Sequence, residues 1–392
     1  MRPPARTGAA VAVVLLLTGC GSTSAAVPDW RPQPSFVGEG HLPNIQLPIP
    51  GQSGPNGPPS DQGGPMPSGQ TPSPSKSNAQ DPAVLATKLT TPTALVLLPD
   101  GSALVGERTT GRLLRVQPMP DKAVPVVRTI AGLSTVGSGG LLDLALSPHY
   151  SQDGLIFAYL TTATDNRVVA FTLTGPITPV FTGIPRGASG NGGRIAFGAD
   201  GLLYVGTGTA GDPGAASEPT SLAGKVLRLT DIGGPAPGNP NPSSPIFATG
   251  AAAVTGLCLD TKSGALITVG AASDSQVKQV LAGAVTPIAS LPVKQGGPGG
   301  CAVMNSVLYI SSLDGKDLVS TPLTVKSGAL NVGTFAPLLP NKYGRLLTVV
   351  AAPDGALWLT TSNRDGKGAP VPTDERVIRI VPSGGGADNG SV

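Results

Sequence analysis

Residues 97–105 read LLPDGSALV, with the pair Asp100-Gly101 between two apolar runs. The same arrangement returns as FGADGLLYV at residues 197–205 and as APDGALWL at residues 352–359. Glycine, and to a lesser extent aspartate, tolerates the positive φ angle that a tight hairpin requires. Each copy therefore predicts two short antiparallel strands joined by a tight turn.

Weaker copies of this turn stand between the strong ones, at Asp153-Gly154, Ser263-Gly264 and Asn305-Ser306. The turns recur about every 50 residues, which is the length of a four-stranded propeller blade. Six such units fill residues 82–382, so the sequence predicts an all-β fold, a six-bladed β-propeller. Radial closure leaves only short, protected strand edges, which suits a domain with many strands and few charges. A pair of β-sandwiches is the alternative, but it would not require this period.

The segment before the repeats begins like an exported lipoprotein. Arg2 and Arg6 precede an apolar run over residues 9–17, and the sequence LTGC follows at residues 17–20. This pattern is typical of a signal peptide with a lipobox, and its apolar run is shorter than the roughly 20 residues that span a bilayer. We expect residues 1–19 to be removed and Cys20 to carry the lipid that anchors the protein to the extracytoplasmic face of a cell membrane. A plain secretory signal with an incidental cysteine is the alternative.

Proline, glycine, serine, glutamine and asparagine dominate the chain from Gly21 to about Asp81. A segment of this composition cannot bury enough apolar surface to fold. We therefore expect residues 20–81 to form a disordered linker, a spacer between the membrane and the propeller, and residues 383–392 to form a disordered tail. A binding role for the proline segments of the linker is the alternative.

Charge and cysteine content indicate which class of partner and which state of the cysteines to expect. The chain has 26 basic and 23 acidic residues, a net charge of +3 and only 12% charged residues, so no nucleic acid is expected as a partner. Lipidation of Cys20 leaves Cys258 and Cys301, and outside the cytoplasm such a pair suggests a disulfide. Two separate buried thiols are the alternative. The pair lacks the ligand spacing of a zinc site, and we expect no metal centre.

The domain resembles the glucose/sorbosone dehydrogenase family through motifs spread over nearly its whole length. The motifs are LPDG at 98–101, ERTTGR at 107–112, GGLL at 139–142, NRVV at 166–169, NGGRI at 191–195, LYVGTG at 203–208, SLAGKVLR at 221–228, YGRL at 343–346 and NRDG at 363–366. The resemblance implies a six-bladed propeller whose active members bind pyrroloquinoline quinone (PQQ) and calcium and oxidise sugars. In these members a histidine takes the hydroxyl proton while hydride passes to the quinone, and cationic side chains hold the cofactor's carboxylates.

Several positions of the family's site carry other residues in this chain. The histidine that directly precedes Asn-Gly-Gly-Arg in the family falls on Gly190. The two histidines of the chain are His41, in the linker, and His149, which we expect in an exposed loop. The acid of the family's Gly-Thr-Gly-Asp falls on Thr209, and its Gly-His-Arg-Asn segment falls on GAAA at residues 250–253.

The cations that would hold the cofactor are also reduced in number. The cation expected after Ser-Leu in the fifth unit falls on Asp314, although Lys316 is near in sequence. The second arginine of the family's Arg-x-Arg falls on Leu347, while Arg345 is retained. Loss of a charged partner typically costs a few kcal/mol of binding free energy, so we expect neither PQQ nor calcium as a cofactor.

These observations favour a membrane-anchored envelope lipoprotein with a non-catalytic propeller that binds a small ligand, an envelope glycan or another protein. The candidate ligand-binding residues are Asn191, Arg194 and Arg345. For several retained residues we expect turns and interblade hydrogen bonds as the main role, namely Asn191, Arg194, Glu107, Arg108 and Arg112. The alternative is a PQQ-dependent sugar or alcohol oxidoreductase with a rearranged site that uses Arg345, Lys316 and a base other than histidine. A calcium-dependent, lactonase-like hydrolase is a third class, which would need Glu, Asn and Asp side chains that converge on the central channel.

Overall fold

The computed structural model describes residues 81–270 and 275–382 of the chain. The predicted signal peptide (1–19), Cys20, the linker up to residue 80, His41 and the tail (383–392) lie outside the described residues. Asp81, expected as the last linker residue, has contacts within the folded part. Its carboxylate accepts hydrogen bonds from the Tyr343 hydroxyl at 2.9 Å and the Ala83 backbone N–H at 3.0 Å. Among the described residues, no helix is long and apolar enough to cross a bilayer.

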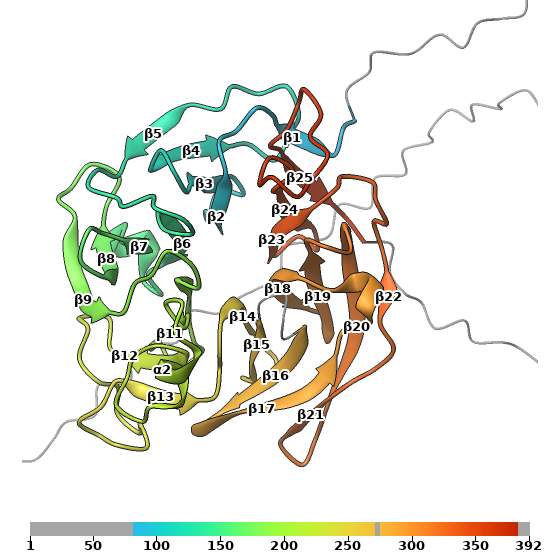
Figure 1. The fold of residues 1–392 in the computed structure, drawn as a ribbon. Helices are drawn as coiled ribbons and strands as arrows, with labels where there is room; N and C mark the ends of the chain where they lie inside the picture. Colours follow the sequence, from blue (N-terminus) through green and yellow to red (C-terminus); the bar gives the residue numbers. More distant parts are fainter. Residues whose placement is uncertain (1–80, 271–274, 383–392) are drawn as a thin grey trace, which may run out of the picture. The chain divides into compact units, whose positions relative to one another are not determined.

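The described strands form six antiparallel blades around a central axis, which confirms the predicted β-propeller (Figure 1). We number the blades in chain order. Blade 1 contains β2 (Pro92–Leu97), β3 (Ala103–Glu107), β4 (Arg112–Val116) and β5 (Val126–Thr129); blade 2 contains β6 (Leu141–Leu146), β7 (Ile156–Thr161), β8 (Asn166–Phe171) and β9 (Thr178–Ile184); blade 3 contains β10 (Gly192–Phe197), β11 (Leu203–Thr207), β12 (Lys225–Leu229) and β13 (Ile246–Thr249).

The second half of the ring follows the same plan. Blade 4 contains β14 (Val254–Leu259), β15 (Leu266–Gly270), β16 (Gln276–Leu281) and β17 (Gly283–Ser290); blade 5 contains β18 (Pro298–Met304), β19 (Val307–Ser312), β20 (Asp317–Lys326), β21 (Ala329–Val332) and the short β22 (Ala336–Pro337); blade 6 contains β23 (Leu346–Ala351), β24 (Leu357–Thr361), β25 (Val377–Ile380) and β1 (Val84–Ala86).

The ring is closed by both ends of the propeller sequence. The inner strands contact one another in the order β2, β6, β10, β14, β18 and β23, and β23 contacts β2. In blade 6 the outermost strand is β1, from the start of the described chain, and Val84 lies opposite Ile378 of β25. The contact between blades 3 and 4 differs from the others, because β13 and β17 pair in parallel and link the outer edges of these two blades. The first and last strands therefore hold each other in place.

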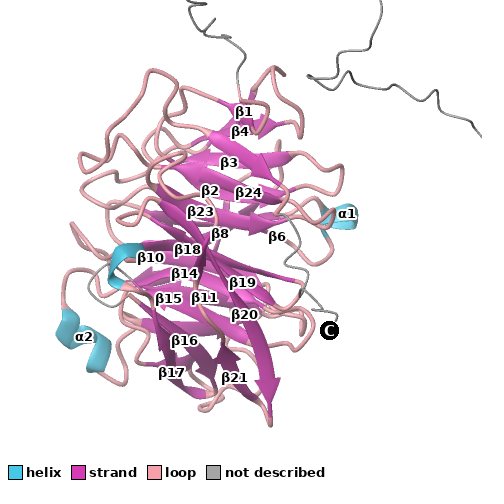
Figure 2. Ribbon diagram, turned by 90° about the vertical axis from the view of Figure 1, so that its right-hand side faces the viewer, coloured by secondary structure: helices cyan, strands magenta, loops and turns pink. Residues whose placement is uncertain are grey.

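The strand order gives the propeller two distinct faces. All inner strands begin at one face, here called the funnel face, and end at the opposite face. The connections between blades and the loops between second and third strands therefore lie on the funnel face. Figure 2 shows the two α-helices on different faces, with α2 (Pro213–Ser217) on the funnel face and α1 (Tyr150–Asp153) on the other. The 3₁₀ helix η1 (Val293–Gln295) belongs to the connection between blades 4 and 5.

The Asp-Gly turns lie on the opposite face and confirm the hairpins predicted at residues 97–105, 197–205 and 352–359. In blade 3, Gly201 has a φ of +72°, and the Asp200 carboxylate accepts the Leu202 backbone N–H at 3.1 Å. The same carboxylate accepts a hydrogen bond from Arg228 of β12 at 2.7 Å. Blades 1 and 6 repeat the constellation, with the pairs Asp100–Arg115 and Asp354–Arg379. The turn is thus tied to the third strand of its own blade.

The apolar core of the described residues is divided among the interfaces between blades. One buried cluster lies between each pair of neighbours; Trp358 belongs to the cluster between blades 6 and 1. Between blades 4 and 5, the structure joins Cys258 of β14 to Cys301 of β18 in a disulfide with a Cα–Cα distance of 5.8 Å. The disulfide cross-links two inner strands at a point where they already contact each other.

Candidate functional site

A cavity of about 700 Å³ opens on the funnel face, where the inner strands begin. Its wall includes several positions of the site that the family resemblance predicts, namely Gly190, Asn191, Arg194, Ala253 and Leu347. Below it lies a second cavity of about 390 Å³, formed by the later halves of the inner strands. Leu347 and Ala253 line the upper cavity without filling it, so the funnel is open toward its own face.

Arg194 forms the floor between the two cavities, because it lines both of them. It projects from β10 into the central channel and donates hydrogen bonds to backbone carbonyls of four other blades. These are Thr255 at 2.5 Å, Gly299 at 2.9 Å, Thr93 at 3.3 Å and Leu142 at 3.4 Å. The guanidinium of Arg194 therefore ties the inner strands together, and its donors are directed at the protein itself.

Asp143 of β6 is the acidic partner of Arg194, with 3.7 Å between the carboxylate and the guanidinium. Its other oxygen accepts the Ile195 backbone N–H at 2.9 Å. Burial raises the pKa of Asp143 to about 6, against the opposing effects of Arg194 and the backbone N–H donors. The charge of Arg194 is thus matched by a carboxylate that ionises only near neutral pH.

Asn191 is buried and has its amide group fully occupied by neighbouring loops. Its carbonyl oxygen accepts hydrogen bonds from Asn166 at 3.1 Å and from the Gly187 N–H at 2.9 Å. Its NH₂ group donates to Ser138 and to the Gly187 carbonyl, both at 2.9 Å. These contacts hold the connection between blades 2 and 3 against the wall of the funnel.

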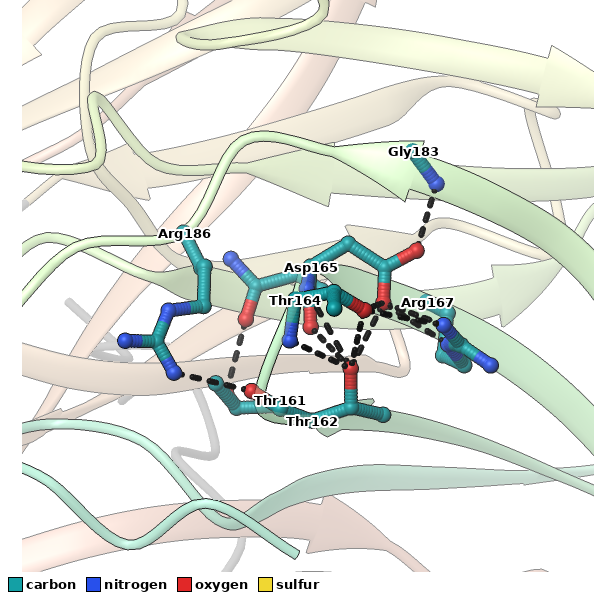
Figure 3. A network of polar contacts seen from close by, with 8 residues as sticks. Thr161, Thr162, Thr164, Asp165, Arg167, Gly183 and Arg186 are labelled. Atoms are coloured by element: carbon teal, nitrogen blue, oxygen red, sulfur yellow. Dashed lines mark hydrogen bonds and ion pairs between the residues drawn. The ribbon is translucent and has the colours of Figure 1, made fainter.

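Figure 3 shows a second network, in and around the loop between β7 and β8 on the funnel face. The Asp165 carboxylate accepts hydrogen bonds from the Gly183 N–H at 2.7 Å, the Thr162 hydroxyl at 2.7 Å and the Arg167 guanidinium at 2.8 Å. Burial acts to raise the pKa of Asp165, but these hydrogen bonds outweigh it and hold the pKa below its usual value. Arg186 donates to the Thr162 carbonyl at 3.0 Å and braces the same loop from the other side. These hydrogen bonds link the loop between β7 and β8 to neighbouring segments.

Arg345 is buried and is held by two carboxylates. Its Nε donates to Asp365 at 2.8 Å, and its Nη1 donates to Asp314 at 2.9 Å and to the Leu313 carbonyl at 3.1 Å. Asp314 occupies the position where the family resemblance predicts a cation. Asp314 therefore replaces the expected cation and also neutralises Arg345.

The other altered positions are arranged as follows. Gly190, at the position of the family's base, has a φ of +66°, and its carbonyl accepts the Ala210 N–H at 2.8 Å. Lys316, which could have replaced the missing cation, lines a separate cavity beside Tyr343. His149 is exposed in the turn before α1, as expected, on the face opposite the funnel. None of these three residues supplies a base or a cation to the funnel.

A calcium-dependent, lactonase-like hydrolase would need several acidic side chains close together. Among residues 81–270 and 275–382, no group of three or more His, Cys, Asp or Glu side chains is arranged to hold a metal ion. Of the two arginines retained from the family's motifs at this site, Arg345 is held by two carboxylates and Arg194 donates to four backbone carbonyls, so neither offers a free cation to PQQ.

Two funnel arginines were missed as ligand-binding candidates. Arg108, expected to fix a turn, lines the upper cavity and donates from Nη1 to the carbonyls of Gly139 at 2.9 Å and Gly137 at 3.0 Å. Arg364, from the NRDG motif, lines the same cavity. The neighbouring Glu107 does have the expected structural role, because it is fully buried and accepts two hydrogen bonds from Arg112, at 2.7 and 3.0 Å. Both arginines belong to family motifs, ERTTGR at 107–112 and NRDG at 363–366, and this membership is the sequence signal that could have identified them.

Comparisons with known proteins agree with the fold and with the motifs. A family model described as glucose / sorbosone dehydrogenase matches residues 89–284. The aldose sugar dehydrogenase YliI of Escherichia coli (strain K12) is 30% identical over 166 residues, which are 38% of this chain and 44% of that protein. The aligned part of the chain thus spans less than half the length of this curated relative.

Solved structures match over a greater length. The PQQ-bound form of aldose sugar dehydrogenase from Streptomyces coelicolor has 35% sequence identity and a TM-score of 0.70, over 76% of this chain and 95% of that one. An oxidoreductase from Thermus thermophilus, described as a glucose dehydrogenase, has 34% identity and a TM-score of 0.68, over 76% of this chain and 98% of that one. The similarity thus covers the propeller as a whole.

Proposed function

Because the chain belongs to the glucose/sorbosone dehydrogenase family, we propose that its funnel binds an aldose sugar or the sugar end of an envelope glycan without oxidising it. The family relationship supports the class of ligand, and the funnel supplies the space. A cavity of about 700 Å³ is in the range of sites that enclose small ligands.

The observation that carries this proposal is the pairing of Arg345 with Asp314 and Asp365, at 2.9 and 2.8 Å. A quinone with several carboxylates needs unpaired cations, and a guanidinium already shared by two carboxylates attracts a third only weakly. Asp314, which is half exposed beside Arg345, would also repel a carboxylate of the cofactor. A neutral sugar has no such conflict with these residues.

The position of the catalytic base supports the same proposal. Abstraction of a hydroxyl proton needs a group with a pKa near the operating pH, within hydrogen-bond reach of the substrate. Gly190 has no side chain, and a Cβ atom added there would lie 2.9 Å from the Thr209 hydroxyl oxygen. A sugar beside Gly190 and Thr209 would meet hydroxyl and backbone groups, which bind sugar hydroxyls but do not take a proton from them.

Isothermal titration of the full chain with glucose tests this function. We expect saturable binding, and we expect Ala253→Trp to abolish it because the indole would fill the wall of the funnel. Val293→Trp is the matched control, since Val293 is 98% exposed outside the funnel and the variant should bind like the parent chain. No detectable heat from glucose or other aldoses, or equal binding by Ala253→Trp, would overturn the proposal.

A second candidate is a PQQ-dependent oxidoreductase with a rearranged site. The comparisons support this candidate more directly than the first, because a structure with 35% identity over 95% of its own chain contains PQQ. In this case Arg108 and Arg364 would have to replace the cations of the family site. Reduction of an electron-accepting dye by the chain in the presence of PQQ, calcium and an aldose would establish the second candidate and exclude the first.

We further propose that Cys20 anchors the protein to the extracytoplasmic face of the membrane as a lipoprotein. A diacylglyceryl group provides two chains, and each buried methylene contributes about 0.8 kcal/mol, which is enough for stable anchoring. In cells fed an alkyne-bearing fatty acid, the parent chain should be labelled and recovered with membranes. Cys20→Ala should lose both properties. A labelled Cys20→Ala chain, or an unlabelled parent chain, would refute the anchor.

A further inference from the structure

Two arginines on the funnel wall come from adjacent blades. Arg108 directly follows β3 in blade 1, and Arg364 lies three residues after β24 in blade 6, so both stand on the funnel face. Blades 1 and 6 are neighbours because β2 contacts β23. Both arginines line the same cavity.

In the described part of the chain, backbone carbonyls are the hydrogen-bond acceptors of both guanidinium groups, and neither group has a carboxylate partner. Arg364 donates to the Asp374 carbonyl at 3.0 Å and to the Val371 carbonyl at 3.3 Å. Arg108 has the two carbonyls of Gly137 and Gly139. Burial lowers the pKa of Arg108, and no acid offsets this effect. Both positive charges therefore lack a carboxylate partner among the described residues.

The other charges of the funnel are already matched. Asp365 also lines the cavity, but one of its oxygens accepts from Arg345 at 2.8 Å and the other from the Lys367 N–H at 2.9 Å. Arg194 is matched by Asp143 at 3.7 Å. The charge that remains available to a ligand in this cavity is thus positive and is located on Arg108 and Arg364.

We propose that the funnel selects an anionic sugar, with the acid group of the ligand between Arg108 and Arg364. This inference rests on the proposed binding function and specifies its ligand. A guanidinium offers paired N–H donors that match the oxygens of a carboxylate or a phosphate, and such charge-assisted hydrogen bonds are about twice as strong as neutral ones. Hydroxyl groups of Ser138, Ser189 and Ser362 line the same cavity and suit the hydroxyls of the sugar.

The test compares three ligands that share one ring: glucose, glucuronate and glucose 6-phosphate. Titration of the full chain should give affinities for at least one anionic sugar about tenfold higher than for glucose, and this preference should weaken as salt is raised. The stronger of the two anions identifies the acid group, carboxylate or phosphate. Arg108→Gln and Arg364→Gln should each reduce binding of the anion about tenfold more than they reduce binding of glucose.

Arg379→Gln is the matched control, because it removes the same charge from the opposite face, where Arg379 pairs with Asp354. This variant should bind both anions like the parent chain, and thermal unfolding should verify that all three variants are folded. Equal affinity for glucose and both anions would overturn the charge inference and leave the sugar-binding function standing. Binding of none of the three ligands would overturn both. Unchanged anion binding by Arg108→Gln and Arg364→Gln would also refute the inference.

Discussion

At the scale of single residues, Arg345 and Arg194 show how retained arginines are committed to other groups. Arg345 lies between Asp314 and Asp365, and Arg194 donates to carbonyls of four blades. A buried charged side chain that already has several hydrogen bonds gains little from a ligand that would first have to break them. Retention of an arginine in a sequence motif therefore does not imply that its charge is available.

Asp143 should make the free energy of unfolding of the propeller fall as pH rises. Its folded pKa of about 6 is above the usual aspartate value of 3.8, so the folded chain binds the proton more tightly than the unfolded chain. The contribution is fully present below pH 3.8 and is lost as pH rises through about 6. Asp143→Asn cannot ionise, so its free energy of unfolding should increase relative to the parent chain between about pH 4 and pH 7.

Urea unfolding of both chains at several pH values measures this difference. The asparagine keeps an oxygen that can accept the Ile195 N–H, so the variant should remain folded. Several other carboxylates, among them Asp165 and Asp200, have pKa values held below the usual range, and their effect falls at lower pH. A stability difference that is constant across this range would contradict the raised pKa of Asp143.

At the scale of the strands, close packing between blades restricts the side chains that the second strand of a blade can have. Gly206 of β11 faces the inner strand of blade 4, and a Cβ atom there would lie 2.6 Å from Cγ1 and 3.0 Å from Cβ of Val254. The clash involves a side chain fixed by its own strand, so the two blades would have to move apart. Glycine is thus required by space at this position.

We expect Gly206→Ala to lower the free energy of unfolding by about 1–3 kcal/mol, the usual cost of an overpacked core. Gly234→Ala is the control, because an added Cβ atom there would meet only the Thr230 hydroxyl oxygen, at 3.4 Å. Urea denaturation of both variants gives the comparison. Equal effects of the two substitutions would mean that the blades can separate at no cost.

The disulfide between blades 4 and 5 should stabilise the chain mainly through its unfolded state. It closes a loop with a sequence separation of 43 residues, for which chain entropy predicts about 4 kcal/mol. The double variant Cys258→Ser with Cys301→Ser should therefore unfold at a clearly lower urea concentration than the parent chain. Dithiothreitol should shift the parent chain toward the variant and leave the variant unchanged. An identical midpoint for parent and variant would contradict a stabilising disulfide.

At the scale of the whole molecule, the fold could be predicted from sequence because it rests on local signals. Each Asp-Gly turn needs only its own neighbours, and the turn spacing then gives the blade length. The pairing of β1 with β25 and the parallel contact of β13 with β17 have no such local signal. They depend on ring closure, which brings together segments that are far apart or unrelated in sequence.

The candidate site could be predicted less well, because its properties depend on contacts between segments that are far apart in the sequence. Sequence motifs identified Asn191, Arg194 and Arg345 as candidates, but their availability depends on partners in other blades or loops. Asp314 and Arg345 are 31 residues apart and meet only because neighbouring blades align their loops. Arg108 and Arg364 have no carboxylate partner in the described structure, and no sequence motif indicates this.

The most direct test of the central claim is a dye-reduction assay on the full chain with PQQ in excess, calcium and glucose. The aldose sugar dehydrogenase from Streptomyces coelicolor, whose PQQ-bound structure is similar, provides the active control under the same conditions. Glucose binding is verified in the same sample by titration. A funnel with a neutralised Arg345 and no base at Gly190 predicts glucose binding with no dye reduction above the protein-free rate. Dye reduction that saturates with glucose and depends on added PQQ would contradict this account.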